Sequence, residues 1–265
     1  MVKKIITYFI YTLLATGLGV YLYFAFILKR EGESSLVCKS VTVTLLDSIE
    51  NRIVSKSEVI SIIDSYNGKV IGKNMSEINV AEIERLLNIR SAIKEAQVSI
   101  TRGGDMSVEI MQRKPILRIE TKNGGFYVDE TEYIFPLVDH FTSYVPIVNG
   151  HIPLAIDNNH RGVASDDINS WMHGILELGR FINGNKFWDS QIEQIYVDKS
   201  GDIIFYPRVG DHKIIFGEAK DIEDKFNKLY TFYKNAIPNK GWSRYKSINL
   251  KYKDQIVCKL NKGAK

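Results

Sequence analysis

Side chains that could bind a metal or exchange protons are scattered along this chain. A zinc site needs clustered histidine, cysteine or carboxylate ligands, and the sequence contains no short H-x-x-x-H pair. The five histidines are His140, His151, His160, His173 and His212. We interpret them as structural or surface residues, and we expect no metal and no cofactor.

Residues that could act in catalysis also have simpler structural explanations. A serine or cysteine nucleophile needs a base and an oxyanion site, and no G-x-S-x-G motif is present. Asp129 and Glu130 are adjacent acids, but in a hairpin they would face opposite sides, so we expect solvated turn residues. Gly103-Gly104 lies between predicted strands and lacks the lysine and helix start of a phosphate loop. We therefore expect no enzyme activity and no small-molecule substrate.

The two cysteines allow two interpretations. In an oxidising compartment Cys38 and Cys258 could form a disulfide. Cys258, however, alternates with Ile256 and Leu260 on one face of a predicted strand. That pattern favours a buried free thiol.

The net charge of +4 is confined to the first 30 residues. These hold Lys3, Lys4, Lys29 and Arg30 and no acidic residue. Of the 35 Lys and Arg residues, 31 therefore remain in the rest of the chain, against all 31 acidic residues. Nucleic-acid-binding domains usually carry a basic patch, so this neutral balance gives no indication of nucleic-acid binding.

An uncharged apolar run from Ile5 to Leu28 separates the two pairs of basic residues. At about 1.5 Å per residue, a helix of this length exceeds a hydrocarbon core of about 30 Å. A cleaved signal peptide has a shorter apolar stretch of about 7–15 residues, and a lipoprotein cysteine at Cys38 would follow a bulky valine. We predict a tail over 1–4, a retained transmembrane helix over Ile5 to Leu28 and a linker over 29–39. The flanking basic residues are equal in number, so they leave the orientation open.

The pattern of apolar and capping residues over 40–113 predicts a small β-α-α-β-β domain. An alternating apolar run predicts the first strand. The patterns S-x-x-E and N-x-x-E, which begin at Ser55 and Asn79, predict the N-termini of two helices. The turn at Gly103-Gly104 then separates two alternating runs and predicts a hairpin.

Residues 114–260 predict a mixed β-sheet domain with two or more helices, followed by a tail over 261–265. Apolar residues recur at helical spacing over about 167–181 and 221–235, and Pro238 is expected to stop the second helix. The strand candidates are Ile116–Glu120, Gly125–Asp129, Ile134–Leu137, Gln191–Asp198, Ile203–Tyr206, Lys213–Phe216 and Ser247–Leu260. The predicted fold class is therefore α+β, behind a single N-terminal transmembrane helix.

This organisation resembles the FtsQ/DivIB cell-division family, and its small domain resembles a POTRA domain. The segments that carry the resemblance are SKSEVISII (55–63), IGKNMSEINVAEIERLLNIRSAIKEAQVSI (71–100), MSVEIMQRKPILRI (106–119), GFYVDETEYIFPL (125–137), VPIVNG (145–150), IIFGEAKDIEDKFNKLYTFYK (214–234) and YKSINLKYKDQIVCKL (245–260). Two departures are notable. Glu130-Thr131-Glu132 replaces an aspartate-x-x-glycine turn, and Asn249 and Lys251 replace aspartate and arginine in the last strand.

The resemblance implies a non-catalytic component of the bacterial divisome. Its N-terminus would lie in the cytoplasm, its single helix in the cell inner membrane, and its ectodomain in the periplasm at the division septum. It would bind FtsB- and FtsL-like single-pass proteins and other divisome components, and it would help to control septal peptidoglycan synthesis. The alternatives are a POTRA-bearing envelope assembly or secretion factor and, without any supporting constellation of residues, a tethered cell-wall enzyme.

The predicted last strand, Ser247–Leu260, is the candidate partner-binding site. Lysines on a sheet edge can simply prevent aggregation. Alternatively, the edge accepts a strand from a partner through main-chain hydrogen bonds, which the resemblance favours. The candidate residues are Lys251, Tyr252, Lys253, Ile256, Val257 and Lys259, of which Lys251, at the position of the family's arginine, and Tyr252 are carried over from the family by position.

Overall fold

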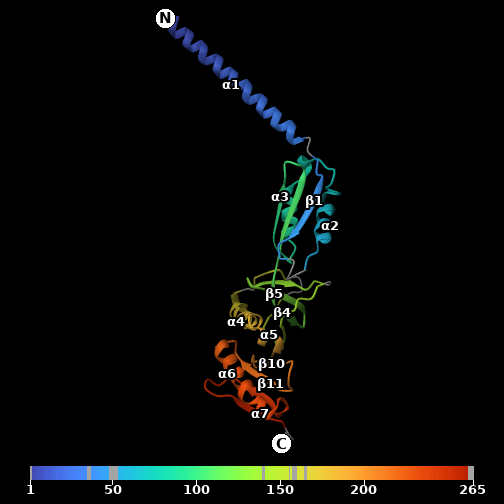
Figure 1. Cartoon of the computed structure of the whole chain (residues 1–265), viewed down its shortest axis with the longest axis vertical. Coiled ribbons are helices and arrows are strands. Elements are labelled where there is room, and N and C mark those ends of the chain that lie inside the picture. The colour runs from blue at the N-terminus through green and yellow to red at the C-terminus, as the bar shows by residue number, and fades with distance from the viewer. Residues whose placement is uncertain are drawn as a thin grey trace. The chain divides into compact units, whose positions relative to one another are not determined.

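The computed structural model describes residues 2–34, 37–47, 53–138, 141–154, 156, 160–163 and 166–261. It contains an apolar N-terminal helix, a small mixed sheet with helices and a ten-stranded mixed sheet with helices (Figure 1). This is the α+β fold that the sequence predicts. The chain divides into two compact units, one formed by Met1–Glu50 with Val54–Gln112 and the other by Asn51–Ile53 with Arg113–Lys265.

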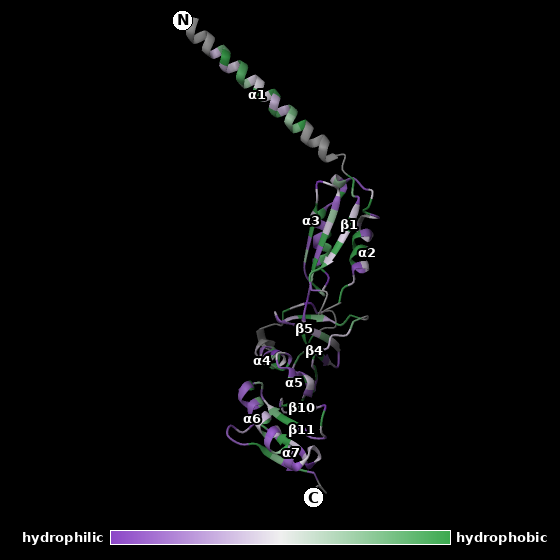
Figure 2. Ribbon diagram, viewed as in Figure 1, coloured by the Kyte–Doolittle hydropathy of each residue, from purple (hydrophilic) through white to green (hydrophobic). Residues whose placement is uncertain are grey.

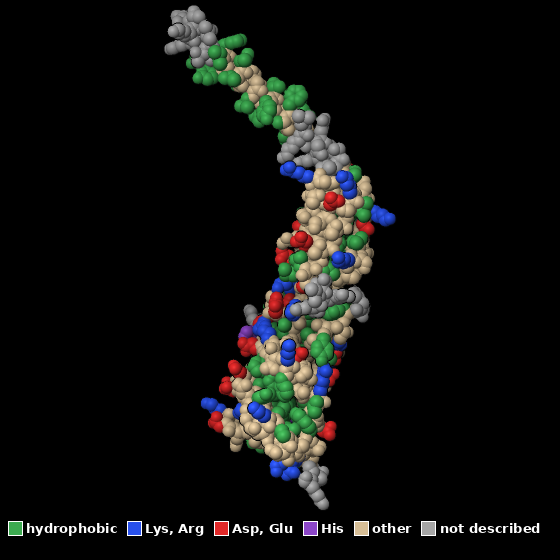
Figure 3. All heavy atoms as spheres, viewed as in Figure 1, with side chains coloured by type: hydrophobic (Ala, Val, Ile, Leu, Met, Phe, Trp, Pro, Cys, Tyr) green, Lys and Arg blue, Asp and Glu red, His purple; other side chains and the backbone are tan. Residues whose placement is uncertain are grey.

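The N-terminal helix α1 covers Val2–Ser34. Its segment Tyr8–Ile27 has a mean hydropathy of 1.8 and is, among the described residues, the one helix long and apolar enough to cross a membrane. This segment consists mostly of hydrophobic residues (Figure 2), and their side chains lie on its surface (Figure 3). The helix continues beyond Leu28 into the segment predicted as a linker. These properties are consistent with a signal anchor or a single membrane span.

The first unit also contains a three-stranded sheet and two helices. Its elements are β1 (Ser40–Leu45), α2 (Lys56–Asn67), a 3-10 helix (Met75–Glu77), α3 (Val80–Asn88), β2 (Ile93–Ile100) and β3 (Asp105–Gln112). The strand order is β1-β3-β2, with β1 parallel and β2 antiparallel to the central β3. The predicted β-α-α-β-β order and its hairpin are therefore confirmed.

Local sequence explains both helix starts in this unit. The Ser55 hydroxyl accepts a hydrogen bond from the Glu58 N–H at 3.1 Å, and the Asn79 side chain accepts one from the Glu82 N–H at 3.1 Å. These bonds satisfy N–H groups that a helix N-terminus leaves unpaired. Both capping predictions are confirmed.

One face of the small sheet is covered by the helices. Helix α3 packs against β2, and α2 packs against β1. The most deeply buried hydrophobic residues of α2, α3, β2 and β3 are Val59, Ile63, Ile83, Leu87, Ile93, Met106, Val108 and Ile110. Along β3 the buried residues alternate with more exposed ones, as a strand with one covered face requires.

The second unit is built around a ten-stranded sheet. Its elements are β4 (Pro115–Thr121), β5 (Gly124–Asp129), β6 (Tyr133–Pro136), β7 (Ile147–Gly150), β8 (Gly162–Val163), α4 (Asp166–Asn183), α5 (Lys186–Gln191), β9 (Ile192–Val197), β10 (Ile203–Pro207), β11 (Lys213–Gly217), α6 (Ile222–Asn235), α7 (Ile237–Lys240), a 3-10 helix (Trp242–Arg244), β12 (Tyr245–Asn249) and β13 (Val257–Leu260). The strand order is β13-β12-β11-β10-β9-β7-β4-β5-β6-β8. Helix α6 connects the parallel strands β11 and β12, so it is a crossover helix next to the β13 end of the sheet.

An aromatic cluster joins the helices to the sheet in this unit. Phe226 of α6 stacks on Phe181 of α4, with 4.7 Å between ring centroids. Trp188 of α5 lies 4.8 Å from the Phe226 ring, and Phe216 of β11 lies 5.4 Å from it. Figure 2 shows hydrophobic residues along β10 and β11, which lie under this cluster. Burial of these rings stabilises the sheet end that carries β12 and β13.

Asp129 is not the solvated turn residue that the sequence predicts. It is only 1% exposed, and its Oδ2 binds the Arg113 guanidinium at 2.7 Å. Its Oδ1 accepts N–H groups of Thr131 and Tyr133, at 2.8 and 3.0 Å. The error arises because alternation within a hairpin does not reveal a cation contributed by a distant residue, here Arg113 at the start of the unit.

The turn after Asp129 places a non-glycine residue in a left-handed backbone conformation. Glu132 adopts a φ of 65°, in the left-handed region that glycine favours. Its carboxylate lies 3.0 Å from Nδ1 of His173 on α4, and this contact helps to hold the turn.

Pro238 does not simply end a helix. Helix α6 ends at Asn235, and Pro238 then lies in the first turn of α7, where proline is tolerated. The short elements β7, β8 and α5 were also not among the predicted ones. Each is shorter than the periodic window on which a prediction depends.

Candidate partner-binding site

The predicted last strand is a hairpin rather than one continuous strand. β12 ends at Asn249, whose side-chain oxygen accepts the Lys251 N–H at 2.9 Å. β13 then returns antiparallel to β12, with Val257 opposite Asn249. The prediction of a single strand over Ser247–Leu260 is therefore wrong. An asparagine side chain that bonds the backbone two residues on favours a turn, and here that turn interrupts the apparent alternation.

β13 lies at the end of the ten-stranded sheet, and within the described ranges it pairs only with β12. The Asn261 N–H donates to the Arg244 carbonyl at 2.9 Å. Because backbone groups alternate along a strand, the Lys259 N–H also faces β12, whereas the N–H groups of Cys258 and Leu260 point away from it. β13 therefore presents hydrogen-bonding groups that a further strand can use.

The two sides of β13 differ in chemistry. Cys258 lies opposite Ile248, which belongs to the helix-covered core, and Cys258 packs against that core. Val257 and Lys259 lie on the other side, which we call the outer face, and both are exposed. A strand added to β13 would contact core-side apolar groups on one side and the outer-face residues on the other.

Cys258 is a free, half-buried thiol. Its burial raises the pKa of the thiol. The sequence also predicts that it shares a buried face with Leu260, but Leu260 is 48% exposed. Leu260 is exposed because β13 is the terminal strand of the sheet, and in the described structure no further strand lies beside its free edge. Cys38, in the other unit, is also free, and burial raises its pKa.

Lys251 does not extend freely into solvent. Its Nζ binds the Asp202 carboxylate at 2.7 Å, and this hydrogen bond raises the pKa of the lysine. Its side chain also lies on Gly217, where an added Cβ would come within 2.8 Å of the Lys251 Cγ. Lys251 therefore fixes the start of the hairpin turn against β10 and β11.

Tyr252 and Lys253 form the tip of the turn. Their carbonyl oxygens both accept hydrogen bonds from Nζ of Lys228 on α6, at 2.7 and 2.9 Å. The Tyr252 side chain remains 48% exposed. Lys228 was not among the predicted site residues, and a lysine on an amphipathic helix gives no sequence signal for such a contact.

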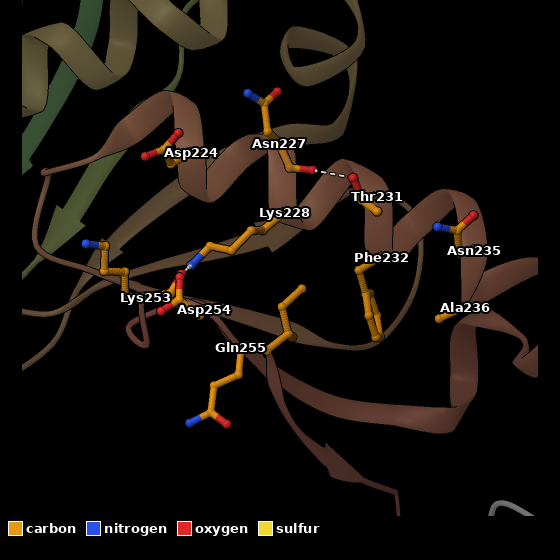
Figure 4. A pocket seen from close by; sticks show the side chains of 11 residues that line it. Asp224, Asn227, Lys228, Thr231, Phe232, Asn235, Ala236, Lys253, Asp254 and Gln255 are labelled. Carbon is orange, nitrogen blue, oxygen red and sulfur yellow. Dashed lines mark hydrogen bonds between the residues drawn. The ribbon is translucent and has the colours of Figure 1, made fainter.

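An open groove of about 710 Å³ runs between α6 and the turn (Figure 4). Asn227, Thr231 and Asn235 line it from α6, and Lys253, Asp254 and Gln255 line it from the turn. Phe232 and Ile256 provide apolar surface. Ile256 directly precedes Val257, so the groove ends next to the start of β13.

The predicted site residues all lie on the β12–β13 hairpin, but they contact different parts of the second unit. Lys253 and Ile256 line the groove, Tyr252 is at the exposed tip, and Val257 and Lys259 lie on the outer face of β13. Lys251 is held in an ion pair.

The described histidines have structural contacts of their own and do not line the groove between α6 and the turn. His173 contacts the Glu132 and Glu177 carboxylates, and the hydrogen bond that its ring donates to Glu132 is the largest cause of its raised pKa. His212 is buried, with Nε2 at 2.8 Å from the Tyr233 hydroxyl. His140 lies outside the described residues. Over the described ranges, no three His, Cys, Asp or Glu side chains form a group that could hold a metal ion.

Comparison with protein families places the hairpin edge in a known type of domain. The model of the family described as FtsQ/DivIB, C-terminal related matches residues 114–259, more than half of the 265 residues. The chain belongs to the FtsQ/DivIB-related family. A POTRA-like domain model also matches residues 36–111. No curated protein is similar enough to the chain to count as a match.

Family membership bears on the kind of site that the β12–β13 hairpin could form. Proteins of the FtsQ/DivIB-related family are typically non-catalytic. All of the predicted site residues, from Lys251 to Lys259, lie within the matched C-terminal region.

Proposed function

We propose that this protein is a non-catalytic, single-pass scaffold of the bacterial division machinery that helps to control septal peptidoglycan synthesis. In this proposal residues 1–4 are cytoplasmic and the helix over Ile5 to Leu28 spans the inner membrane. The POTRA-like domain (40–113) and the C-terminal domain (114–260) are periplasmic. Membership of the FtsQ/DivIB-related family and the apolar helix α1 support this assignment.

The proposed binding site is the β13 edge, where an FtsB- or FtsL-like single-pass partner adds a strand. The observation that carries this proposal is the end position of β13 in the sheet, with outward N–H groups at Cys258 and Leu260. In strand addition, main-chain hydrogen bonds provide affinity and alternate side chains provide selectivity. Val257 and Lys259 would contact the partner, whereas Lys251 would hold the turn in place.

A proline substitution tests strand addition directly. Leu260→Pro removes an outward N–H while leaving the Lys259 N–H free to bond β12. Leu260→Ala is the matched control, because it shortens the side chain but keeps the N–H. We expect co-purification of the single-pass partners with the full-length protein to fall at least about tenfold in Leu260→Pro and much less in Leu260→Ala. Equal recovery with both variants and the native protein would rule out this edge.

The cellular role has its own test. A fluorescent fusion of the full-length protein is expected to form a band at midcell in dividing cells. A uniform envelope signal throughout the division cycle would contradict a division role and would favour the alternative of a POTRA-bearing assembly or secretion factor.

A further inference from the structure

A row of residues crosses the outer face next to the β13 edge. Lys213 of β11 is opposite Ser247 of β12, and Ser247 is opposite Lys259 of β13. Neighbouring strands are about 4.8 Å apart, which places the backbones of the two lysine positions about 10 Å from each other. The row therefore contains two positive charges, and one of them, the exposed Lys259, lies at the edge of the sheet.

No ion pair neutralises this row in the part of the chain that the structure describes. The ion pairs of the second unit include Lys251 with Asp202 but none that involves Lys213 or Lys259. Charge also gathers in the segment from Lys240 to Asn261, where six residues are basic and one, Asp254, is acidic. Because residues 31–265 are neutral as a whole, the edge hairpin is a basic region in a neutral ectodomain.

The other β13 positions are apolar or contact the core. Val257 is on the outer face and 45% exposed, next along that face from Lys259. Cys258 and Ile256 pack against the core on the opposite side, where Leu260 is left exposed. A strand paired with β13 would therefore meet one positive charge between apolar positions.

We propose that the β13 edge selects an extended partner segment with an acidic residue opposite Lys259 and apolar residues opposite Leu260, Cys258 and Val257. In antiparallel pairing this segment reads apolar–acidic–apolar–apolar. The inference rests on the proposed strand-addition function and specifies its partner. Opposite charges directly across a strand pair stabilise it, whereas like charges destabilise it.

This inference differs from a purely protective role of the edge lysine. A lysine that only prevents aggregation makes every added strand less favourable and gives no preference for acidic over neutral partners. A selective lysine rejects a basic partner and accepts an acidic one, so specificity arises from repulsion as well as attraction.

The test uses the full-length protein in detergent micelles and fluorescent twelve-residue peptides. One peptide carries a central Val-Glu-Val-Val, the second Val-Lys-Val-Val, and the third has the charge of the first but proline at alternate positions. We expect fluorescence anisotropy at low salt to show the glutamate peptide binding at least about threefold more tightly than the lysine peptide. The order should reverse in the Lys259→Glu variant, and it should disappear in Lys259→Gln.

The possible failures can be told apart. If both strand-forming peptides bind equally and Leu260→Pro abolishes their binding, charge selection is overturned while strand addition stands. If neither peptide binds and partner recovery is also insensitive to Leu260→Pro, both proposals fail. If the proline-containing peptide binds as tightly as the glutamate peptide, binding depends on charge without strand pairing, which also overturns the inference.

Discussion

The buried pair between Arg113 and Asp129 is expected to be a main support of the second unit. Arg113 begins this unit, its guanidinium carbon lies 3.4 Å from the centroid of the Tyr133 ring, and its Nη1 binds Asp129 at 2.7 Å. In Asp129→Ala the guanidinium loses its counter-charge, and the backbone donors of the turn lose their acceptor. Removing one partner of a buried ion pair costs about 3–5 kcal/mol.

Two different substitutions at Asp129 separate the contribution of its negative charge from that of its hydrogen bonds to the turn. Asp129→Asn keeps one oxygen for the N–H groups of Thr131 and Tyr133 but removes the negative charge. We expect it to lower the free energy of unfolding by about 2 kcal/mol, the scale of a hydrogen bond to a charged group. Asp129→Ala should cost clearly more than Asp129→Asn.

Tryptophan fluorescence provides the assay. The three tryptophans, Trp171, Trp188 and Trp242, all lie in the second unit, so urea unfolding followed by their emission reports on that unit alone. A double-mutant cycle with Arg113→Ala should give a coupling energy of about 1–3 kcal/mol. The reasoning is refuted if Asp129→Ala costs less than about 1 kcal/mol, or if the effects of the two substitutions simply add.

Three further predictions concern the sheet end that carries the candidate site. Burial lowers the pKa of His212 below its ordinary value of 6.5, so the unfolded chain binds a proton more readily and stability should fall as the pH drops below about 6.5. Urea unfolding at pH 7.5 and 5.5 should show this loss, and His212→Gln should reduce it; an unchanged pH dependence would contradict it. Gly217 has a φ of 81° and contacts the Lys251 side chain, so Gly217→Ala should cost about 1–3 kcal/mol by the same assay, and no loss would show that the backbone relaxes freely. Lys228→Met removes both hydrogen bonds to the turn carbonyls and should speed amide hydrogen exchange over residues 251–256, whereas Lys234→Met, in the last turn of the same helix, should not.

The sequence predicts most elements because their signals are local. Ser55 and Asn79 cap helices by bonding an N–H three residues away, and such bonds require no knowledge of the remaining fold. The alternating residues of β3 similarly report which face is covered. Features of this kind depend on neighbours in sequence, so their prediction succeeded.

The features that prediction missed depend on residues distant in sequence. Asp129 is 16 residues from Arg113, and Lys228 is 24 residues from the Tyr252 carbonyl that it binds. Neither contact leaves a periodic pattern. The turn after Asn249 did leave a signal, an asparagine followed by the polar run Lys251-Tyr252-Lys253-Asp254, but the surrounding alternation of apolar residues concealed it.

The local geometry of the candidate site therefore differs from the one that the sequence predicts. A continuous strand would have placed Lys251 and Tyr252 on the docking edge. The hairpin instead places Lys251 in an ion pair with Asp202 and leaves Val257 and Lys259 on the edge strand. The binding role of all of these residues remains a prediction.

The most direct test of the central claim is site-specific photo-crosslinking in the native bacterium. A photoreactive residue at Leu260, on the edge strand, is compared with one at Tyr144, an exposed position in the same unit. We expect the Leu260 probe to capture a single-pass division protein, identified by mass spectrometry, and the Tyr144 probe to leave that protein uncaptured. Capture of no such protein from Leu260, or equal capture from both positions, would contradict strand addition at β13.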